Sequence, residues 1–160
     1  MKRYLTLFVV CVCLAGCATN KPIPDGYTGK RATIKDTYKH VSSTKSYFFQ
    51  LAKIDKRNVL TSSSATYERN YGQGMMMSVV TTEREVPAVK ALLHIEGITH
   101  VAAPILAFGG GMYSVEGDVE VNLESGKTYI VHGKLSEKYS AVWVEDNKGN
   151  IVSKKIEKKG

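Results

Sequence analysis

The stretch "YSVEGDVEVNL", residues 113–123, decides the fold. Its apolar residues fall on alternate positions, at Val115, Val119, Val121 and Leu123. The positions between them are polar: Glu116, Asp118, Glu120 and Asn122. Successive side chains of a strand point to opposite faces of a sheet. The pattern therefore predicts a strand with one buried face and one solvated face.

Similar stretches lie on both sides of it. In "AVKALLHIE" (88–96), Val89, Ala91, Leu93 and Ile95 share one face, and Lys90, Leu92, His94 and Glu96 share the other. Further strands are expected at "KSYFFQLAKI" (45–54), in "MMMSVVTTERE" (75–85), and at "KTYIVHGKL" (127–135), "SAVWVED" (140–146) and "NIVSKKIE" (150–157).

The separators between these stretches are typical of antiparallel hairpins. "ESGK" (124–127) and "DNKGN" (146–150) have turn composition, and we expect "EGIT" (96–99) to be a further turn. "SSSATYERNYG" (62–72), with serines at its start and a glycine at its end, permits one short helix. Short strands with tight turns indicate a sandwich or a barrel, and we expect an all-β, antiparallel β-sandwich.

Residues 1–16 have the three parts of a secretory signal peptide. Lys2 and Arg3 precede an apolar run, Leu5 to Gly16, that ends in small residues. This run is shorter than the roughly 20 residues of a membrane-spanning helix. The alternative interpretations of residues 1–16 are an ordinary cleaved signal peptide, which Cys17 follows by chance, or a helix of the protein core.

The end of this segment, Leu14-Ala15-Gly16-Cys17, resembles the lipobox of bacterial lipoproteins. The resemblance implies that the Cys17 thiol carries diacylglycerol, that the chain is cut before Cys17, and that the new amino group is acylated, with palmitate as a typical acyl chain. Ala18 follows, where an aspartate would imply retention in the inner membrane. The resemblance thus implies an outer-membrane lipid anchor, with the domain facing the periplasm.

The lipobox sets the expected domain organisation. Residues 1–16 are the signal peptide, residues 17–30 form a proline- and glycine-containing tether, and residues 31–160 form one domain. All three cysteines lie at or before Cys17. The domain therefore has no disulfide, no cysteine nucleophile and no thiolate metal site, and it folds by its core alone.

A second resemblance lies in residues 121–153. Gly126, Lys127, Tyr129, Trp143, Asp146 and Gly149 match a pattern in this stretch. It is similar to the C-terminal hairpin pair of many small, uncharacterised bacterial lipoproteins. This resemblance implies a β fold and no particular chemistry.

The catalytic motifs that the sequence suggests each lack a required element. "SGKT" (125–128) lacks the earlier glycine of a phosphate-binding loop, and the S-x-x-K spacing at 42–45 lacks its companion elements. His94, Glu96, His100 and His132 have no specific metal-binding spacing. We therefore expect no catalytic residues, no metal site and no cofactor.

Two unusual stretches, "YGQGMMM" (71–77) and "FGGGMYS" (108–114), place glycines beside methionine and aromatic residues. They are either mobile loops beside core strands or parts of an adaptable apolar binding surface. The candidate surface consists of Met75, Met76, Met77, Met112, Tyr113 and Trp143. Because Val142 and Val144 face the core, Trp143 points outward, and we expect other parts of the chain to cover it.

The leading functional hypothesis is a non-enzymatic structural or interaction module of the cell envelope. The alternatives are a small-ligand or polysaccharide binder and, less favoured, an envelope hydrolase. Without Lys2 and Arg3, 20 of the 22 basic residues remain against 15 acidic ones, a net charge of +5. The expected partners are the membrane, through Cys17, and an envelope protein or cell-wall polymer. Nucleic acid is not expected.

Overall fold

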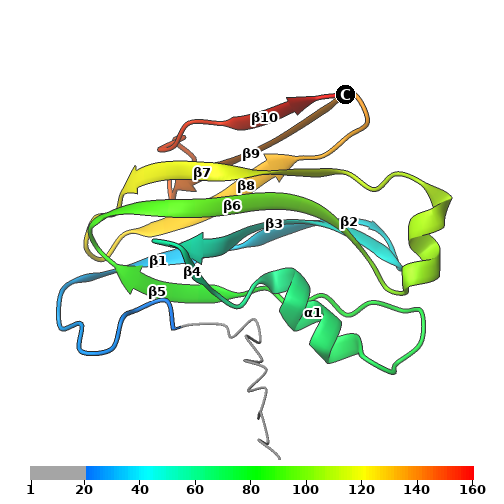
Figure 1. Cartoon of the computed structure of the whole chain (residues 1–160), viewed down its shortest axis with the longest axis horizontal. Helices are drawn as coiled ribbons and strands as arrows, with labels where there is room; N and C mark the ends of the chain where they lie inside the picture. Colours follow the sequence, from blue (N-terminus) through cyan, green and yellow to red (C-terminus); the bar gives the residue numbers. More distant parts are fainter. Residues whose placement is uncertain (1–20) are drawn as a thin grey trace, which may run out of the picture.

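A computed structural model describes residues 21–160, in which strands predominate (Figure 1). The strands are β1 (Arg31–Lys35), β2 (Thr37–Ser42), β3 (Lys45–Ile54), β4 (Arg57–Asn58), β5 (Glu83–Pro87), β6 (Lys90–Val101), β7 (Ser114–Asn122), β8 (Thr128–Lys134), β9 (Tyr139–Asp146) and β10 (Ile156–Lys159). The helices are α1 (Ser62–Asn70) and a 3₁₀ helix, η1 (Pro104–Gly109). Within residues 21–160, no helix is long and apolar enough to cross a bilayer.

The strands form two sheets that pack face to face. One sheet has the order β10-β9-β8-β1-β5, and the other has the order β2-β3-β6-β7, with β4 paired to β3. All pairs between these strands are antiparallel except β1 with β8, which is parallel. The prediction of an all-β sandwich with one short helix is confirmed.

The core lies between the sheets and contains most of the residues that alternation placed there; the exception is Val89, which precedes β6 and is 45% exposed. Val115, Val119, Val121 and Leu123 of the first stretch are all buried, as are Ala91, Leu93 and Ile95 of β6 and Val142 and Val144 of β9. The intervening residues of β7 face outward. The alternation therefore predicted these inward-facing residues correctly.

The expected turn at 96–99 is wrong, because β6 runs unbroken through these residues. Gly97 sits in the middle of the strand, where a Cβ atom would meet Phe49 Cδ1 at 3.2 Å and Val115 Cγ1 at 3.3 Å. A glycine inside a strand often marks such a close approach rather than a turn. The glycine therefore makes room for the Phe49 ring.

The expected strand in residues 75–85 is also largely wrong, since only β5, from Glu83, forms there. Ser78, Val80 and Thr82 bond instead to side chains of α1. The Asn70 side chain accepts from Ser78 N at 2.8 Å and donates to Ser78 O at 2.8 Å. The Thr66 hydroxyl accepts from Val80 N at 2.9 Å and donates to Val80 O at 3.1 Å. These contacts satisfy the backbone without a neighbouring strand.

The two ends of the chain also differ from expectation. The C-terminal strand is shorter than 150–157, because only Ile156–Lys159 pairs with β9, and Ile151 makes an isolated bridge to Glu145. Strands β1, β2 and β4 were not predicted. Residues 21–30 hold no helix or strand. Cys17 and the signal segment lie outside the described residues.

Candidate binding site at the apolar end

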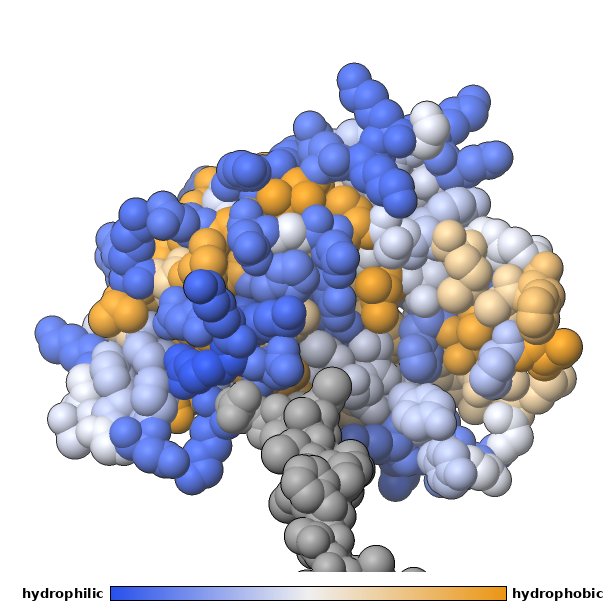
Figure 2. Space-filling model, in the orientation of Figure 1, coloured by the Kyte–Doolittle hydropathy of each residue, from blue (hydrophilic) through white to orange (hydrophobic). Residues whose placement is uncertain are grey.

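Exposed apolar side chains gather at one end of the sandwich, at the right of Figure 2. We define this apolar end as Tyr71, Met75, Met76, Ile105, Phe108 and Met112, all of which are exposed. Phe108 on η1 is 87% exposed and Met76 is 75% exposed. Monomeric soluble proteins rarely expose large contiguous apolar patches unless the patch has a function. The apolar end is therefore the first candidate for a functional surface.

The turn between β2 and β3 holds the two glycine- and methionine-containing segments at this end. Met77 N donates to Ser43 O at 3.1 Å, and Ala102 N donates to Thr44 O at 2.9 Å. Lys45 Nζ donates to Gly110 O at 3.0 Å. The turn thus contacts the first segment through Ser43, and Lys45, the first residue of β3, contacts the second, although the two segments are far apart in the sequence.

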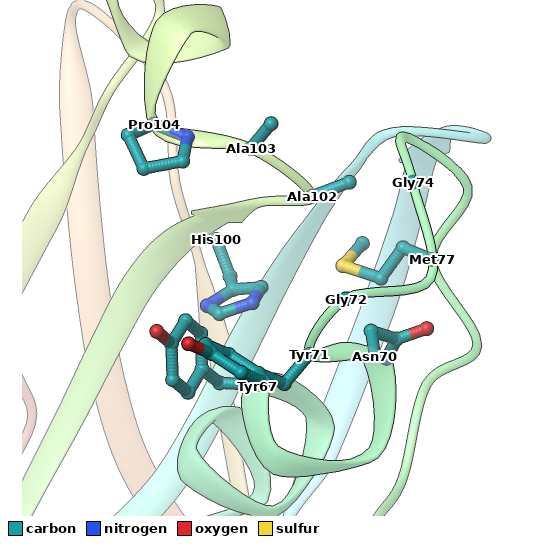
Figure 3. Close-up of a pocket in the computed structure, with 10 residues that line it drawn as sticks. All are labelled: Tyr67, Asn70, Tyr71, Gly72, Gly74, Met77, His100, Ala102, Ala103 and Pro104. Carbon is teal, nitrogen blue, oxygen red and sulfur yellow. The ribbon is translucent and has the colours of Figure 1, made fainter.

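A cavity of about 310 Å³ opens beside the apolar end, between α1 and the end of β6 (Figure 3). It is lined by Tyr67, Asn70, Tyr71, Gly72, Gly74, Met77, His100, Ala102, Ala103 and Pro104. The two tyrosine rings meet edge to face, with centroids 5.9 Å apart. The His100 ring lies beside the tyrosine rings, and Met77 faces the opening from the other side. The walls are thus mainly aromatic and apolar.

His100 supplies the lining of the cavity with an imidazole side chain. Among the described residues, neither of its ring nitrogens makes a hydrogen bond, and its ring packs edge-on against Phe48, with centroids 5.7 Å apart. Burial lowers the pKa of His100 below its ordinary value of 6.5. At neutral pH the ring is therefore uncharged, with one donor and one acceptor nitrogen.

A second hollow shares the Tyr67 and His100 side chains with this cavity. Ser63, Ser64, Tyr67, Glu68 and His100 line the second hollow. Tyr67 and His100 therefore line both a mainly apolar cavity and a polar hollow.

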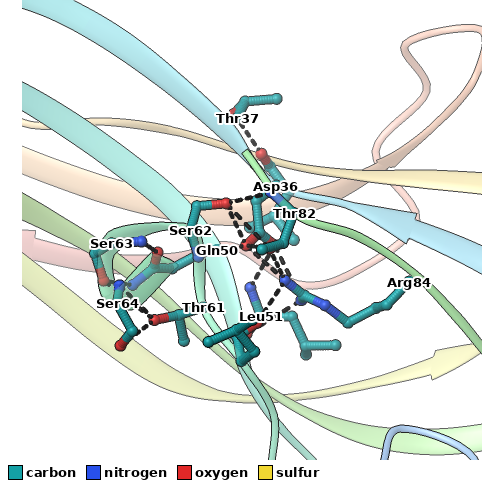
Figure 4. Close-up of polar contacts among 12 residues, drawn as sticks. Asp36, Thr37, Gln50, Leu51, Thr61, Ser62, Ser63, Ser64, Thr82 and Arg84 are labelled. Atoms are coloured by element: carbon teal, nitrogen blue, oxygen red, sulfur yellow. Dashed lines mark hydrogen bonds and ion pairs between the residues drawn. The ribbon is translucent and has the colours of Figure 1, made fainter. Parts of the chain in front are cut away.

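A buried polar network fixes the start of α1 and so the position of these rings (Figure 4). Its centre is Asp36, which lies between β1 and β2, where the chain passes from one sheet to the other. The Asp36 carboxylate accepts from Arg84 at 2.7 and 3.1 Å, from Leu51 N at 3.0 Å and from Thr82 Oγ1 at 2.6 Å. It also accepts from Ser62 N at 3.2 Å and Ser62 Oγ at 2.8 Å, at the first turn of α1.

Gln50 makes a second link between the sheet and α1. Its amide oxygen accepts from Ser63 N at 2.8 Å, and its amide nitrogen donates to Ser63 Oγ at 2.7 Å and to Glu96 Oε1 at 2.6 Å. Burial raises the pKa of Glu96 above its ordinary value, while the bond from Gln50 opposes this shift. Thr61 caps the helix by accepting from Ser64 N at 3.2 Å. Together these bonds attach α1 firmly to the sheet.

The structure brings together only part of the predicted binding surface. Met75, Met76 and Met112 are exposed at the apolar end, whereas Met77 is buried and lines the cavity. Tyr113 is half-buried and lines, with Met112, a different hollow. Trp143 is half-buried on β9, and the Lys155 ammonium lies 4.7 Å from the centroid of its ring. Trp143 contributes nothing to the lining of the cavity.

The candidate metal ligands of the sequence do not meet at one site. His94, Glu96 and His100 share the outward face of β6, but His132 lies on β8 in the other sheet. His94 Nδ1 lies 2.7 Å from Asp118 Oδ1 on β7. Within residues 21–160, no group of three histidine, cysteine, aspartate or glutamate residues is placed to hold a metal ion.

Sequence reasoning missed Asp36, Gln50 and Arg84, which position the site. Gln50, inside the apolar run "YFFQL", carried a usable signal: a polar residue within a buried strand needs a hydrogen-bond partner. Asp36 and Arg84 carried no comparable local signal.

We compared the chain with models of protein families, with curated proteins and with solved structures, and none of the three comparisons found a match.

Proposed function

We propose that this chain is a lipid-anchored lipoprotein of the bacterial cell envelope that acts as a non-enzymatic interaction module. The lipid on Cys17 holds the domain at the outer membrane, facing the periplasm, and the apolar end contacts an envelope protein. The exposure of the apolar end carries this proposal.

The composition of the apolar end supports a protein contact. Tyrosine, phenylalanine and methionine are enriched in protein–protein interfaces, and Tyr71, Phe108 and Met76 are the three most exposed large apolar side chains among the described residues. Methionine side chains adapt to different partner surfaces. A well-packed sandwich would thus present an adaptable contact surface on a rigid support.

Two measurements test the anchor. The intact mass of the protein extracted from membranes should correspond to a chain that starts at Cys17 and carries acyl chains. Cys17→Ser should remove the acyl chains from the measured mass, because no thiol remains at position 17 to be acylated. An unmodified N-terminus at another residue would overturn the lipoprotein assignment.

Site-specific crosslinking tests the contact surface. A photo-crosslinking benzoyl-phenylalanine is placed at Phe108 or at Met76, and at Ser125 as a control. Ser125 is exposed in the turn between β7 and β8. This turn lies at the opposite end of the molecule from η1 (Figure 1). We expect the same discrete adduct from Phe108 and Met76 in intact cells, and no such adduct from Ser125. Equal labelling from all three positions would contradict the proposal.

The cavity beside α1 favours a second candidate function, the binding of a small ligand. Small-molecule sites are concave and mostly apolar, with a few polar groups, and begin at about 300 Å³. The cavity of about 310 Å³ has these properties.

A further inference from the structure

We propose that the cavity between α1 and the end of β6 binds an uncharged aromatic compound of one or two rings, held among Tyr67, His100 and Met77. This inference rests on the second candidate function, because it names the ligand class of the same cavity. It is independent of the protein contact at the apolar end.

The cavity walls select an apolar ligand. Tyr67 and Tyr71 supply aromatic surfaces, Met77 supplies a polarisable thioether, and Pro104 supplies an aliphatic ring. Aromatic rings and methionine sulfur both make favourable contacts with a further aromatic ring. Alanines and glycines complete the lining and leave the space between these side chains open. The cavity volume lies at the lower limit for ligand sites, which limits the ligand to a small molecule.

The electrostatics select an uncharged ligand. No aspartate, glutamate, lysine or arginine lines this cavity. Burying a charged group without a partner is strongly unfavourable. The acceptor nitrogen of the uncharged His100 ring can instead accept one hydrogen bond from a neutral N–H or O–H group of the ligand. A charged aromatic acid therefore binds more weakly than its neutral counterpart.

The hydrogen bonds select against a sugar. A sugar ring presents many hydroxyl groups, each of which needs a partner when it leaves water. Asn70 is the one carboxamide in the lining, and it already bonds to Thr66 O at 2.6 Å and to both backbone groups of Ser78. The polar side-chain groups that remain are His100 and the hydroxyls of Tyr67 and Tyr71. They suffice for one polar group of an aromatic ligand and not for a sugar.

Methyl NMR with indole as the probe tests this proposal on the lipidated protein, which begins at Cys17, in phospholipid nanodiscs. Methionine methyl groups are labelled with ¹³C, so that Met77 reports on the cavity and Met75, Met76 and Met112 report on the apolar end. Indole should shift the Met77 methyl signal selectively and saturably, with a dissociation constant of about 1 mM or below. Benzoate, which is charged, and N-acetylglucosamine, which is a sugar, should leave Met77 unchanged at the same concentrations.

Three variants locate the binding. Tyr67→Ala should weaken indole binding at least about tenfold, because it removes one aromatic wall. Tyr67→Phe should retain most of the affinity. Phe108→Ala should change nothing at Met77, because Phe108 does not line the cavity. Tyr67 is 57% exposed and Phe108 is 87% exposed, so all three variants are expected to fold, and a dispersed methyl spectrum verifies this.

The outcomes separate the proposals. No Met77 shift with indole up to 10 mM, or equal shifts of all methionines in wild type and Tyr67→Ala, would overturn the inference. A Met77 shift with N-acetylglucosamine and none with indole would also overturn it, while leaving a ligand-binding function in place. None of these results alters the crosslinking test of the apolar end.

Discussion

Arg84 contacts Asp36 through both of its terminal nitrogens, at 3.1 Å from Nη1 to Oδ1 and at 2.7 Å from Nη2 to Oδ2. The two side chains are 6% and 0% exposed. The pair joins β5 to the point where the chain changes sheets, and Ser62 of α1 bonds to the same carboxylate. This buried ion pair therefore connects both sheets with the helix beside the cavity.

Asp36→Asn should destabilise the domain by about 3–5 kcal/mol, because it leaves the Arg84 guanidinium buried without a counter-charge. Chemical unfolding followed by circular dichroism measures this change. Glu85→Gln is the matched control, since the Arg31–Glu85 pair has the same 2.7 Å distance but is 49% and 60% exposed. An exposed pair contributes at most about 1 kcal/mol. Equal losses in both variants would show that burial is not the cause.

Gly133→Ala should destabilise the domain by about 1–3 kcal/mol or more through overpacking. A Cβ atom at Gly133 would lie 2.5 Å from the Ala141 carbonyl oxygen and would also collide with the Phe49 ring. The same ring packs against Gly97 in the other sheet. The thermal unfolding midpoint measures this loss.

The control for this prediction is Gly109→Ala at the end of η1. No atom lies within 4 Å of a Cβ at Gly109, and its backbone is not in the left-handed region. This variant should change the unfolding midpoint little. A tolerated Gly133→Ala would mean that the sheets have room to separate at Phe49.

The sequence was informative wherever one face of a strand meets water. In residues 113–123 each outward residue is polar because solvent is its neighbour, so the pattern itself records the burial. Strand β3 was predicted with its observed bounds, 45–54, for a related reason: a run of aromatic and apolar residues ends at polar clusters.

The site was less predictable because its parts meet only in the fold. Both glycine-containing segments place methionine side chains at the surface, since Met75, Met76 and Met112 are exposed, but the sequence alone does not distinguish mobile loops from a binding surface. The cavity depends instead on Tyr67 and His100, which come from a helix and a distant strand. The role of Gly97 was also not predictable, because the sequence does not distinguish a glycine in a turn from a glycine that packs against an aromatic ring.

Glu96→Gln should stabilise the domain at neutral pH. The folded-state pKa of Glu96 is raised by burial, so the folded state favours the protonated form. The stability that protonation supplies is fully present below the ordinary pKa of about 4.5 and is lost as the pH rises through the folded-state pKa. The glutamine should therefore increase the free energy of unfolding at pH 7, with a difference that shrinks towards pH 4. Glu120→Gln, at an exposed position of β7, should not show this pH-dependent gain, and parallel curves for wild type and Glu96→Gln would contradict the prediction.

Acrylamide quenching of Trp143, the only tryptophan, should be slower than that of free indole and should accelerate in Lys155→Ala. The Lys155 ammonium lies over the ring at 4.7 Å from its centroid, and Trp143 Nε1 donates to Glu145 Oε1 at 2.6 Å. A cation–π contact at a partly exposed site contributes about 0.5–1 kcal/mol, so Lys155→Ala should lower stability by no more than that. Lys154→Ala removes the neighbouring exposed lysine and should leave the quenching rate unchanged. If both variants quench like wild type, Lys155 does not shield the ring in solution, and the outward face of β9 is then open to a partner.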